Sequence, residues 1–107
     1  MNYVYISGKI TDNENYAAQF EKREKELKTL GYLPVNPVRI RERLKFKLGR
    51  EPDYQEIINE NISELKKCDY INFLDNWRDS DSAREAYKIA AENNIPILKI
   101  SILSHKW

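Results

Sequence analysis

The sequence predicts an α/β domain of the Rossmann-like, flavodoxin type, a three-layer sandwich around a parallel sheet of four or five strands. Short β-branched and aromatic segments alternate along the chain with segments of helical periodicity. That alternation is typical of a parallel sheet with helices on both faces. The chain has 107 residues and contains no linker, repeat or low-complexity segment, so residues 1–107 are expected to form one domain.

The first predicted strand is residues 3–7, YVYIS, and Gly8 closes it. Residues 11–14, TDNE, have the pattern of a capping box ahead of a helix that ends near Gly31. Residues 32–37, YLPVNP, predict a second short strand that is ended by its last proline.

Residues 38–50, VRIRERLKFKLGR, are compatible with two structures. Basic side chains alternate with mostly apolar ones, which suits either a strand or a basic helix. A solvated basic face is the simpler role for this segment, and a flap that faces a phosphate is the other. Both questions stay open at the level of the sequence.

The second half continues the alternation. Residues 53–56, DYQE, have a capping pattern ahead of a helix with an apolar stripe. Residues 70–77, YINFLDNW, predict the third strand, and the SARE pattern at residues 82–85 predicts the start of another helix. Residues 95–102, IPILKISI, predict the last strand.

Composition excludes several classes of protein. The net charge of +1 provides no bulk attraction for nucleic acid, and no apolar stretch approaches the roughly 20 residues of a membrane helix. A single cysteine, Cys68, suits a reducing compartment, so the cytoplasm is expected. With one cysteine and one histidine, His105, no metal cluster is expected. Neither a G-x-G-x-x-G pattern nor a P-loop is present, so we expect no cofactor.

Ligands of open parallel sheets bind beyond the carboxyl ends of the strands. Ser7, Gly8 and Ile10 follow the first predicted strand, Asn36 ends the second, and Trp77 ends the third. We therefore expect these residues to meet near residues 80–85 and to contribute to a binding site.

Glu85 allows two interpretations. Ser82 and Glu85 have the spacing of a capping box, and on spacing alone that role is the simpler one. A carboxylate near a helix start also stays ionised, which a nucleophile requires. Ser80 and Ser82 would form an anion site with the free N–H groups of that helix start.

Four motifs occur in one order along the chain: YISGKIT…NY…F (residues 5–20), GYLPVNP (31–37), CDYINFLDNW (68–77) and DSDSAREA (79–86). Together they resemble the nucleoside 2-deoxyribosyltransferase-like proteins, and most closely the small bacterial and phage members of that group. The deoxynucleoside-monophosphate N-glycosidases are more distant relatives. The resemblance covers nearly the whole chain except the basic segment.

The resemblance implies roles for particular residues. Glu85 would be the nucleophile that attacks the anomeric carbon, Tyr5 would orient it, and Asp79 would bind the sugar. Ser80 and Ser82 would hold the 5′ end of the sugar or a 5′-phosphate. The resemblance also implies a homo-oligomer, because the related transferases complete their pockets from a neighbouring subunit.

Two residues depart from the transferase pattern. Asn61 stands where the transferases have an aspartate near the base, and an amide binds a base but does not protonate it. Asp81 replaces a glycine and adds negative charge where a phosphate would lie. Trp107 near the end of the tail would need a packing partner, which also favours an oligomer.

The sequence therefore predicts recognition of a nucleoside or nucleotide, with N-glycosidic cleavage or deoxyribosyl transfer through Glu85. A nucleoside monophosphate is expected to bind more tightly than its nucleoside, with Asp81 opposing it. The alternatives are a binder of the same fold that sequesters a nucleotide signal, and a structural interaction module in which Glu85 is only a cap.

Overall fold

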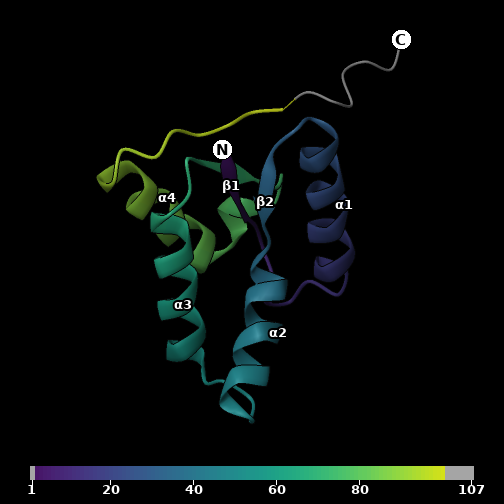
Figure 1. Ribbon diagram of the computed structural model, residues 1–107, viewed down its shortest axis with the longest axis vertical. Helices are drawn as coiled ribbons and strands as arrows, with labels where there is room; N and C mark the ends of the chain where they lie inside the picture. Colours follow the sequence, from purple (N-terminus) through teal and green to yellow (C-terminus); the bar gives the residue numbers. More distant parts are fainter. Residues whose placement is uncertain (1, 101–107) are drawn as a thin grey trace.

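A parallel three-stranded sheet lies between helices in the computed structural model, which describes residues 2–100 (Figure 1). The elements in chain order are β1 (Tyr3–Ser7), α1 (Tyr16–Thr29), β2 (Leu33–Val35), α2 (Pro37–Leu48), α3 (Tyr54–Lys66), β3 (Tyr70–Phe73), the 3₁₀ turn η1 (Trp77–Asp79) and α4 (Asp81–Glu92). The strand order is β2-β1-β3. The arrangement is compatible with a Rossmann-like fold.

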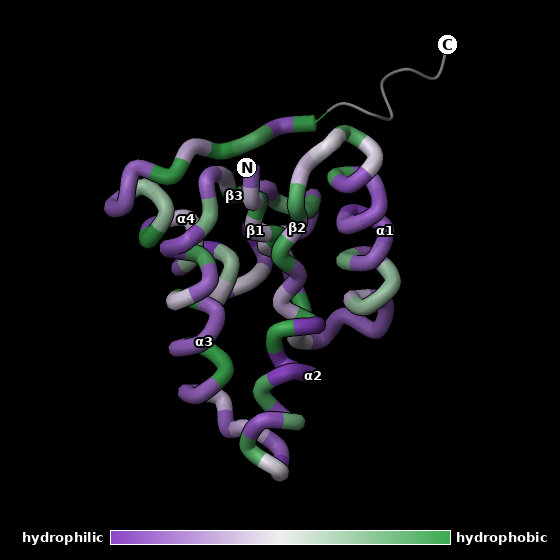
Figure 2. Tube along the Cα trace, viewed as in Figure 1, coloured by the Kyte–Doolittle hydropathy of each residue, from purple (hydrophilic) through white to green (hydrophobic). Residues whose placement is uncertain are grey.

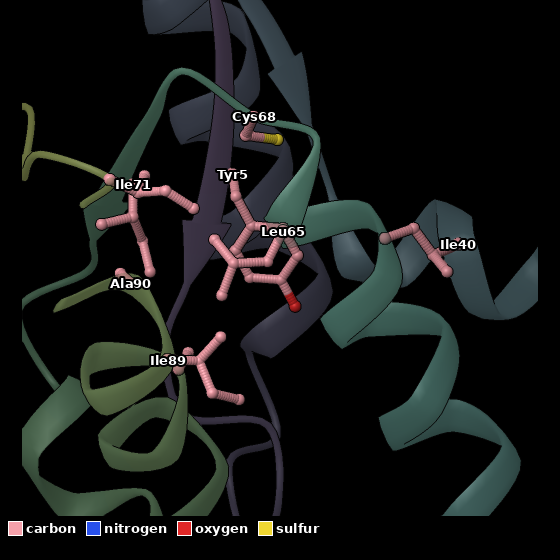
Figure 3. Close-up of a cluster of buried hydrophobic side chains, with 9 residues drawn as sticks. Tyr5, Ile40, Leu65, Cys68, Ile71, Ile89 and Ala90 are labelled. Atoms are coloured by element: carbon pink, nitrogen blue, oxygen red, sulfur yellow. The ribbon is translucent and has the colours of Figure 1, made fainter. Parts of the chain in front are cut away.

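The central strand sends alternate side chains to two separate cores, as the twofold period of a strand requires. Val4 and Ile6 pack against Phe20 and Leu27 of α1 on one face of the sheet. Tyr5, which lies between them, packs on the other face against buried residues of α3 and α4 (Figure 3). In Figure 2 the helices alternate between hydrophilic and hydrophobic colours, which fits elements that each bury one side.

The expectation of four or five strands is wrong for the described part of the chain, because the sheet there has three. Residues 95–100 begin to pair with β3 through a single parallel bridge between Ile71 and Ile97. Beyond that bridge, the Phe73 carbonyl accepts a hydrogen bond from Arg23 Nη1 at 3.2 Å. Residues 101 and 102 of the predicted strand lie outside the described residues, as do His105 and Trp107.

The basic segment is a helix, and local signals define both of its ends. Asn36 accepts a hydrogen bond from the backbone N–H of Val38 as the N-cap, and Pro37 occupies the first turn. Pro37 therefore starts α2 and does not end a strand. At the other end Gly49 adopts a left-handed φ of 70°, which suits a residue without a Cβ atom.

Two of the three predicted capping boxes are wrong. α1 begins after Asn15, whose side chain makes no capping hydrogen bond, and TDNE lies in the preceding turn. α4 begins after Ser80, so the SARE pattern lies inside the helix. The third box is confirmed, because Asp53 and Glu56 exchange hydrogen bonds at the start of α3.

No helix within residues 2–100 is both long and apolar enough to cross a membrane.

Candidate functional site

A pocket of about 260 Å³ lies between α3 and α4, with β1 at its base. The residues that line it are Tyr5, Tyr54, Gln55, Ile58, Asn61, Ile62, Leu65, Asp81, Ser82, Glu85, Ala86 and Ile89. Its volume is just below the range of roughly 300–1,000 Å³ that is usual for small-molecule sites. Four of the predicted site residues meet here: Tyr5, Asn61, Ser82 and Glu85.

The pocket combines apolar walls with few polar groups, as ligand sites commonly do. Ile58 and Ile62 contribute from α3, and Ile89 contributes from α4. Asp81 and Glu85 are the charged residues among those that line it, and no lysine or arginine is among them. The pocket therefore favours a neutral ligand or one that develops positive charge.

Glu85 is not a helix cap. Ser80 is the N-cap of α4, and its hydroxyl accepts a hydrogen bond from the Ala83 N–H at 3.1 Å. Glu85 lies five residues after that cap, in the second turn, where the backbone N–H groups already bond within the helix. Its exposed side chain is therefore not occupied by a capping role and lines the pocket.

Asn61 places an unpaired polar atom in the same pocket. Among residues 2–100, its Oδ1 is the buried side-chain oxygen or nitrogen that lacks a hydrogen-bond partner. Leaving such an acceptor unpaired costs about 1–3 kcal/mol, and folded proteins rarely do so. A ligand with an N–H or O–H donor would satisfy this atom.

Tyr5 contributes a hydroxyl group from the centre of the sheet. Its ring lies beside Leu65, and the hydroxyl is turned away from Cys68 (Figure 3). Burial raises the pKa of the Tyr5 phenol well above its usual range, and the nearby Cys68 and Glu64 raise it further. The hydroxyl therefore stays protonated at neutral pH and is available as a donor.

Cys68 is buried and is not activated. Burial, together with the nearby Glu64 and Asp69, raises the pKa of its thiol to about 12. Its Sγ donates a hydrogen bond to the Glu64 carbonyl at 3.3 Å. A nucleophilic cysteine needs a lowered pKa, so Cys68 is a structural residue.

The start of α4 offers a weaker anion site than its serines predict. The buried Ser80 hydroxyl caps the helix and lies 3.2 Å from the Ser82 hydroxyl. Ser82 is exposed and lines the pocket. Asp81 pairs with Arg84, and this arginine is not among the residues that line the pocket.

The carboxyl end of β1 is filled by the protein itself. A Cβ atom on Gly8 would lie 2.7 Å from Leu74 Cδ1, so this glycine permits close packing. Ser7 is buried, and its carbonyl accepts a hydrogen bond from the Leu74 N–H at 2.8 Å. Ile10 packs against the core on the α1 side. None of these three residues lines the pocket.

The other predicted site residues lie elsewhere. Asn36 is buried as the cap of α2 and borders a different hollow, beside Arg39. Trp77 stacks on Tyr87 with ring centroids 5.4 Å apart and borders a hollow outside β3. Asp79 is exposed in η1 and is not among the pocket residues.

Residues that sequence reasoning did not assign to the site come mainly from α3. Tyr54, Ile58 and Ile62 are spaced by four residues, so they share one helix face that lines the pocket. That spacing was visible as an apolar stripe, but a stripe of this kind normally indicates core packing. In the structure the Tyr54 side chain is 69% exposed, so this face of α3 is not fully covered by its neighbours.

The fold and the pocket define a small α/β protein with a candidate ligand site between two helices on one face of a parallel sheet. The chain belongs to the family described as Domain of unknown function (DUF4406), whose sequence profile matches residues 2–99. No curated protein matches the chain.

Proposed function

We propose that this protein binds a nucleoside in the pocket between α3 and α4 and cleaves its N-glycosidic bond through Glu85. One observation carries the proposal: Glu85 has no capping role and lines the same pocket as Tyr5 and Asn61. These three residues come from separate segments of the chain. Their roles follow the resemblance to the nucleoside 2-deoxyribosyltransferase-like proteins, which remains part of the proposal.

The chemistry uses the negative charge of the pocket. A Glu85 carboxylate oxygen forms a bond to C1′ of the sugar while the bond from C1′ to the base nitrogen breaks. The bonding pair leaves with the base, which takes a proton from water. Positive charge builds on the sugar during this step, and the Glu85 carboxylate stabilises it as the new bond forms.

A second step restores the enzyme. Water attacks C1′ of the glycosyl ester, loses a proton and releases deoxyribose, and Glu85 returns as a carboxylate. If a second base replaces water, the product is a new nucleoside and the reaction is deoxyribosyl transfer. Both routes use the same ester, so one residue serves either activity.

The electrostatics of the pocket favour a nucleoside over its monophosphate. Asp81 and Glu85 line the pocket without a lysine or arginine among the lining residues. A 5′-phosphate would therefore face repulsion that the Ser82 hydroxyl and the helix start must overcome. This reverses the preference for a monophosphate that the serines alone predict.

A non-catalytic nucleoside binder is the second candidate, and Asn61 favours it. The amide cannot protonate a departing base, and Asp79, the predicted sugar partner, is not among the pocket residues. A binder would use the same pocket without forming the ester. The cytoplasmic location and the homo-oligomer stay predictions, and light scattering of the purified protein would test the latter.

The Glu85→Gln variant tests the proposal. A neutral amide cannot form the glycosyl ester, so base release from deoxynucleosides should fall below detection while nucleoside binding persists. Its stability should change by less than about 0.5 kcal/mol, because Glu85 is an exposed residue without a capping role. Chromatography of the released base and a thermal-shift titration measure the two effects.

Glu92→Gln is the matched control, since Glu92 is exposed at the far end of the same helix. It should retain full base release. If the wild-type protein binds deoxynucleosides but releases no base, the binder replaces the enzyme. If Glu85→Gln keeps wild-type base release, Glu85 is not the nucleophile.

A further inference from the structure

A second hollow lies outside β3, and none of the described residues that line it also lines the pocket between α3 and α4. Its volume is about 520 Å³, which lies within the range of roughly 300–1,000 Å³ that is usual for small-molecule sites. Its walls come from α1, β3, η1, α4 and residues 97–100. The reaction proposed above does not use this hollow.

Three aromatic rings form one wall of the hollow. The ring centroids are 4.6 Å apart for Phe73 and Trp77, 5.4 Å for Trp77 and Tyr87, and 6.0 Å for Phe73 and Tyr87. Trp77 and Tyr87 stack outside both hydrophobic cores, and Tyr87 is 43% exposed. Aromatic faces of this kind bind planar rings well, so the wall favours an aromatic ligand.

The charged residues around the hollow are mainly positive. Arg23, Arg78 and Lys99 line it, and Asp75 is the acidic residue among the described residues of its wall. The Arg78 guanidinium lies 4.8 Å from the centre of the Trp77 ring. Within the described part of the chain, neither Arg78 nor Lys99 forms an ion pair. Both charges are therefore available to an anionic ligand.

The Arg23 guanidinium is fixed by the protein itself. Its Nε donates a hydrogen bond to Glu26 at 2.9 Å. Its Nη1 donates to the Asn72 side chain at 2.6 Å and to the Phe73 carbonyl at 3.2 Å. Its Nη2 donates no hydrogen bond to another described residue, so this nitrogen remains available. A side chain held in this way loses little conformational freedom when it binds an anion.

We propose that the hollow outside β3 is a second binding site, which takes a planar aromatic ring that carries an anionic group. The ring packs against Tyr87 and Trp77, and the anionic group accepts hydrogen bonds from the cations of the wall. The charge is opposite to that of the pocket between α3 and α4, which is lined by two carboxylates and no cation among the described residues. This site does not depend on the proposed reaction.

Two matched pairs of ligands test the chemistry. Adenosine 5′-monophosphate and adenosine share one ring system, as do benzoate and benzamide, and only the first member of each pair is an anion. We expect the anion to bind about 10- to 100-fold more tightly than its neutral partner, and to bind more weakly as salt is added. A preference in the first pair alone identifies a nucleotide, and one in the second pair alone identifies an aromatic carboxylate.

The fluorescence of Trp77 provides a readout that is local to the hollow. The chain has two tryptophans, so the Trp107→Phe variant leaves Trp77 as the reporter. A bound ring or anion changes the surroundings of the Trp77 indole, whereas a ligand between α3 and α4 does not contact it. Titration of this variant with each ligand gives the four dissociation constants.

Substitutions of exposed residues test the cations without disturbing the fold. In the Trp107→Phe background, Arg78→Gln and Lys99→Gln should each weaken binding of the anion several-fold. The double variant should lose most of the preference for the anion over its neutral partner. Lys88→Gln is the matched control, since Lys88 is exposed on α4 and is not among the residues that line the hollow. It should bind both anions unchanged.

The outcomes separate this site from the proposed reaction. If neither anion changes the Trp77 fluorescence, or if each neutral ligand binds as tightly as its anion, the inference is wrong. It is also wrong if the double variant binds the anions as tightly as Lys88→Gln does. Benzoate and benzamide have no glycosidic bond, and base release is measured with Glu85→Gln, so either proposal can fail while the other stands.

Discussion

At the scale of single residues, the structure assigns Gly8 a packing role where a ligand was expected. The turn after β1 lies so close to Leu74 that the space a Cβ atom would need is already occupied. Closely packed interiors tolerate such extra atoms poorly. The strand-end glycine therefore brings β1 and the segment after β3 together, and the candidate pocket forms elsewhere.

Gly8→Ala should destabilise the protein by about 1–3 kcal/mol, because the new methyl group overlaps the Leu74 side chain. Urea denaturation measures this change. In a Leu74→Gly background all three overlapping atoms of Leu74 (Cβ, Cγ and Cδ1) are removed, so the same substitution should cost much less. An equal cost in both backgrounds would mean that the contact with Leu74 is not the reason for this glycine.

At the scale of elements, the start of α4 shows how one serine can be mistaken for another. Ser80 and Ser82 both precede acidic or small residues that suit a helix start, and only Ser82 has a glutamate three residues later. The chain nevertheless turns at η1, and its extended backbone at Ser80 makes that residue the cap. This shift of two residues releases Glu85 from capping and places it in the pocket.

Ser80→Ala should therefore cost about 0.5–2 kcal/mol, since it removes the acceptor for the Ala83 N–H. Ser82→Ala should cost less than about 0.5 kcal/mol, because Ser82 is exposed and does not cap the helix. Urea denaturation of the two variants side by side measures the difference. A larger loss for Ser82→Ala would contradict the position of the helix start.

At the scale of the whole molecule, one ion pair connects helices that belong to different cores. Glu24 of α1 is buried, and it accepts two hydrogen bonds from Arg39 of α2, at 2.8 and 2.7 Å. Arg41 and Lys45 of α2 both pair with Glu51 in the next loop. The basic residues of α2 thus serve partly to connect elements within the protein, which accords with a solvated face more than with a phosphate-facing flap.

This ion pair makes stability depend on pH. The hydrogen bonds from Arg39 hold the pKa of Glu24 below its usual range, against the opposing effect of burial. Because the folded pKa is the lower one, the unfolded state binds more protons as the solution is acidified. Its contribution is full above the ordinary glutamate pKa of about 4.5 and is lost as pH falls through the folded pKa.

Glu24→Gln should lower the thermal midpoint at pH 7 and reduce its further decrease below pH about 4.5. Part of the pH dependence should remain, because Arg50 also holds the pKa of Glu56 down, to about 2. Glu21→Gln is the control, since Glu21 is exposed on the same helix. Thermal denaturation between pH 7 and pH 3 measures these effects. Identical pH profiles for Glu24→Gln and the wild type would contradict the role of the pair.

The sequence was sufficient where a structure depends on neighbouring residues. The first strand and the capping box at Asp53 and Glu56 were predicted correctly, because strand propensity and cap geometry involve residues within a few positions of each other. It also nominated Tyr5 and Glu85, which do line one pocket. Tyr5 was nominated by the resemblance alone, whereas Glu85 was singled out by its spacing from Ser82 and received its catalytic role from the resemblance.

Only the tertiary structure decided the number of strands and the membership of the pocket. Residues 95–100 make one parallel bridge to β3 at Ile71, and the next outward carbonyl of β3, that of Phe73, accepts a hydrogen bond from Arg23, far away in the sequence. Whether Asn61 finds a hydrogen-bond partner depends on how α3 packs against α4. The spacing of residues along either helix does not determine that packing. Local rules determine where elements form, and long-range packing determines which of their side chains meet.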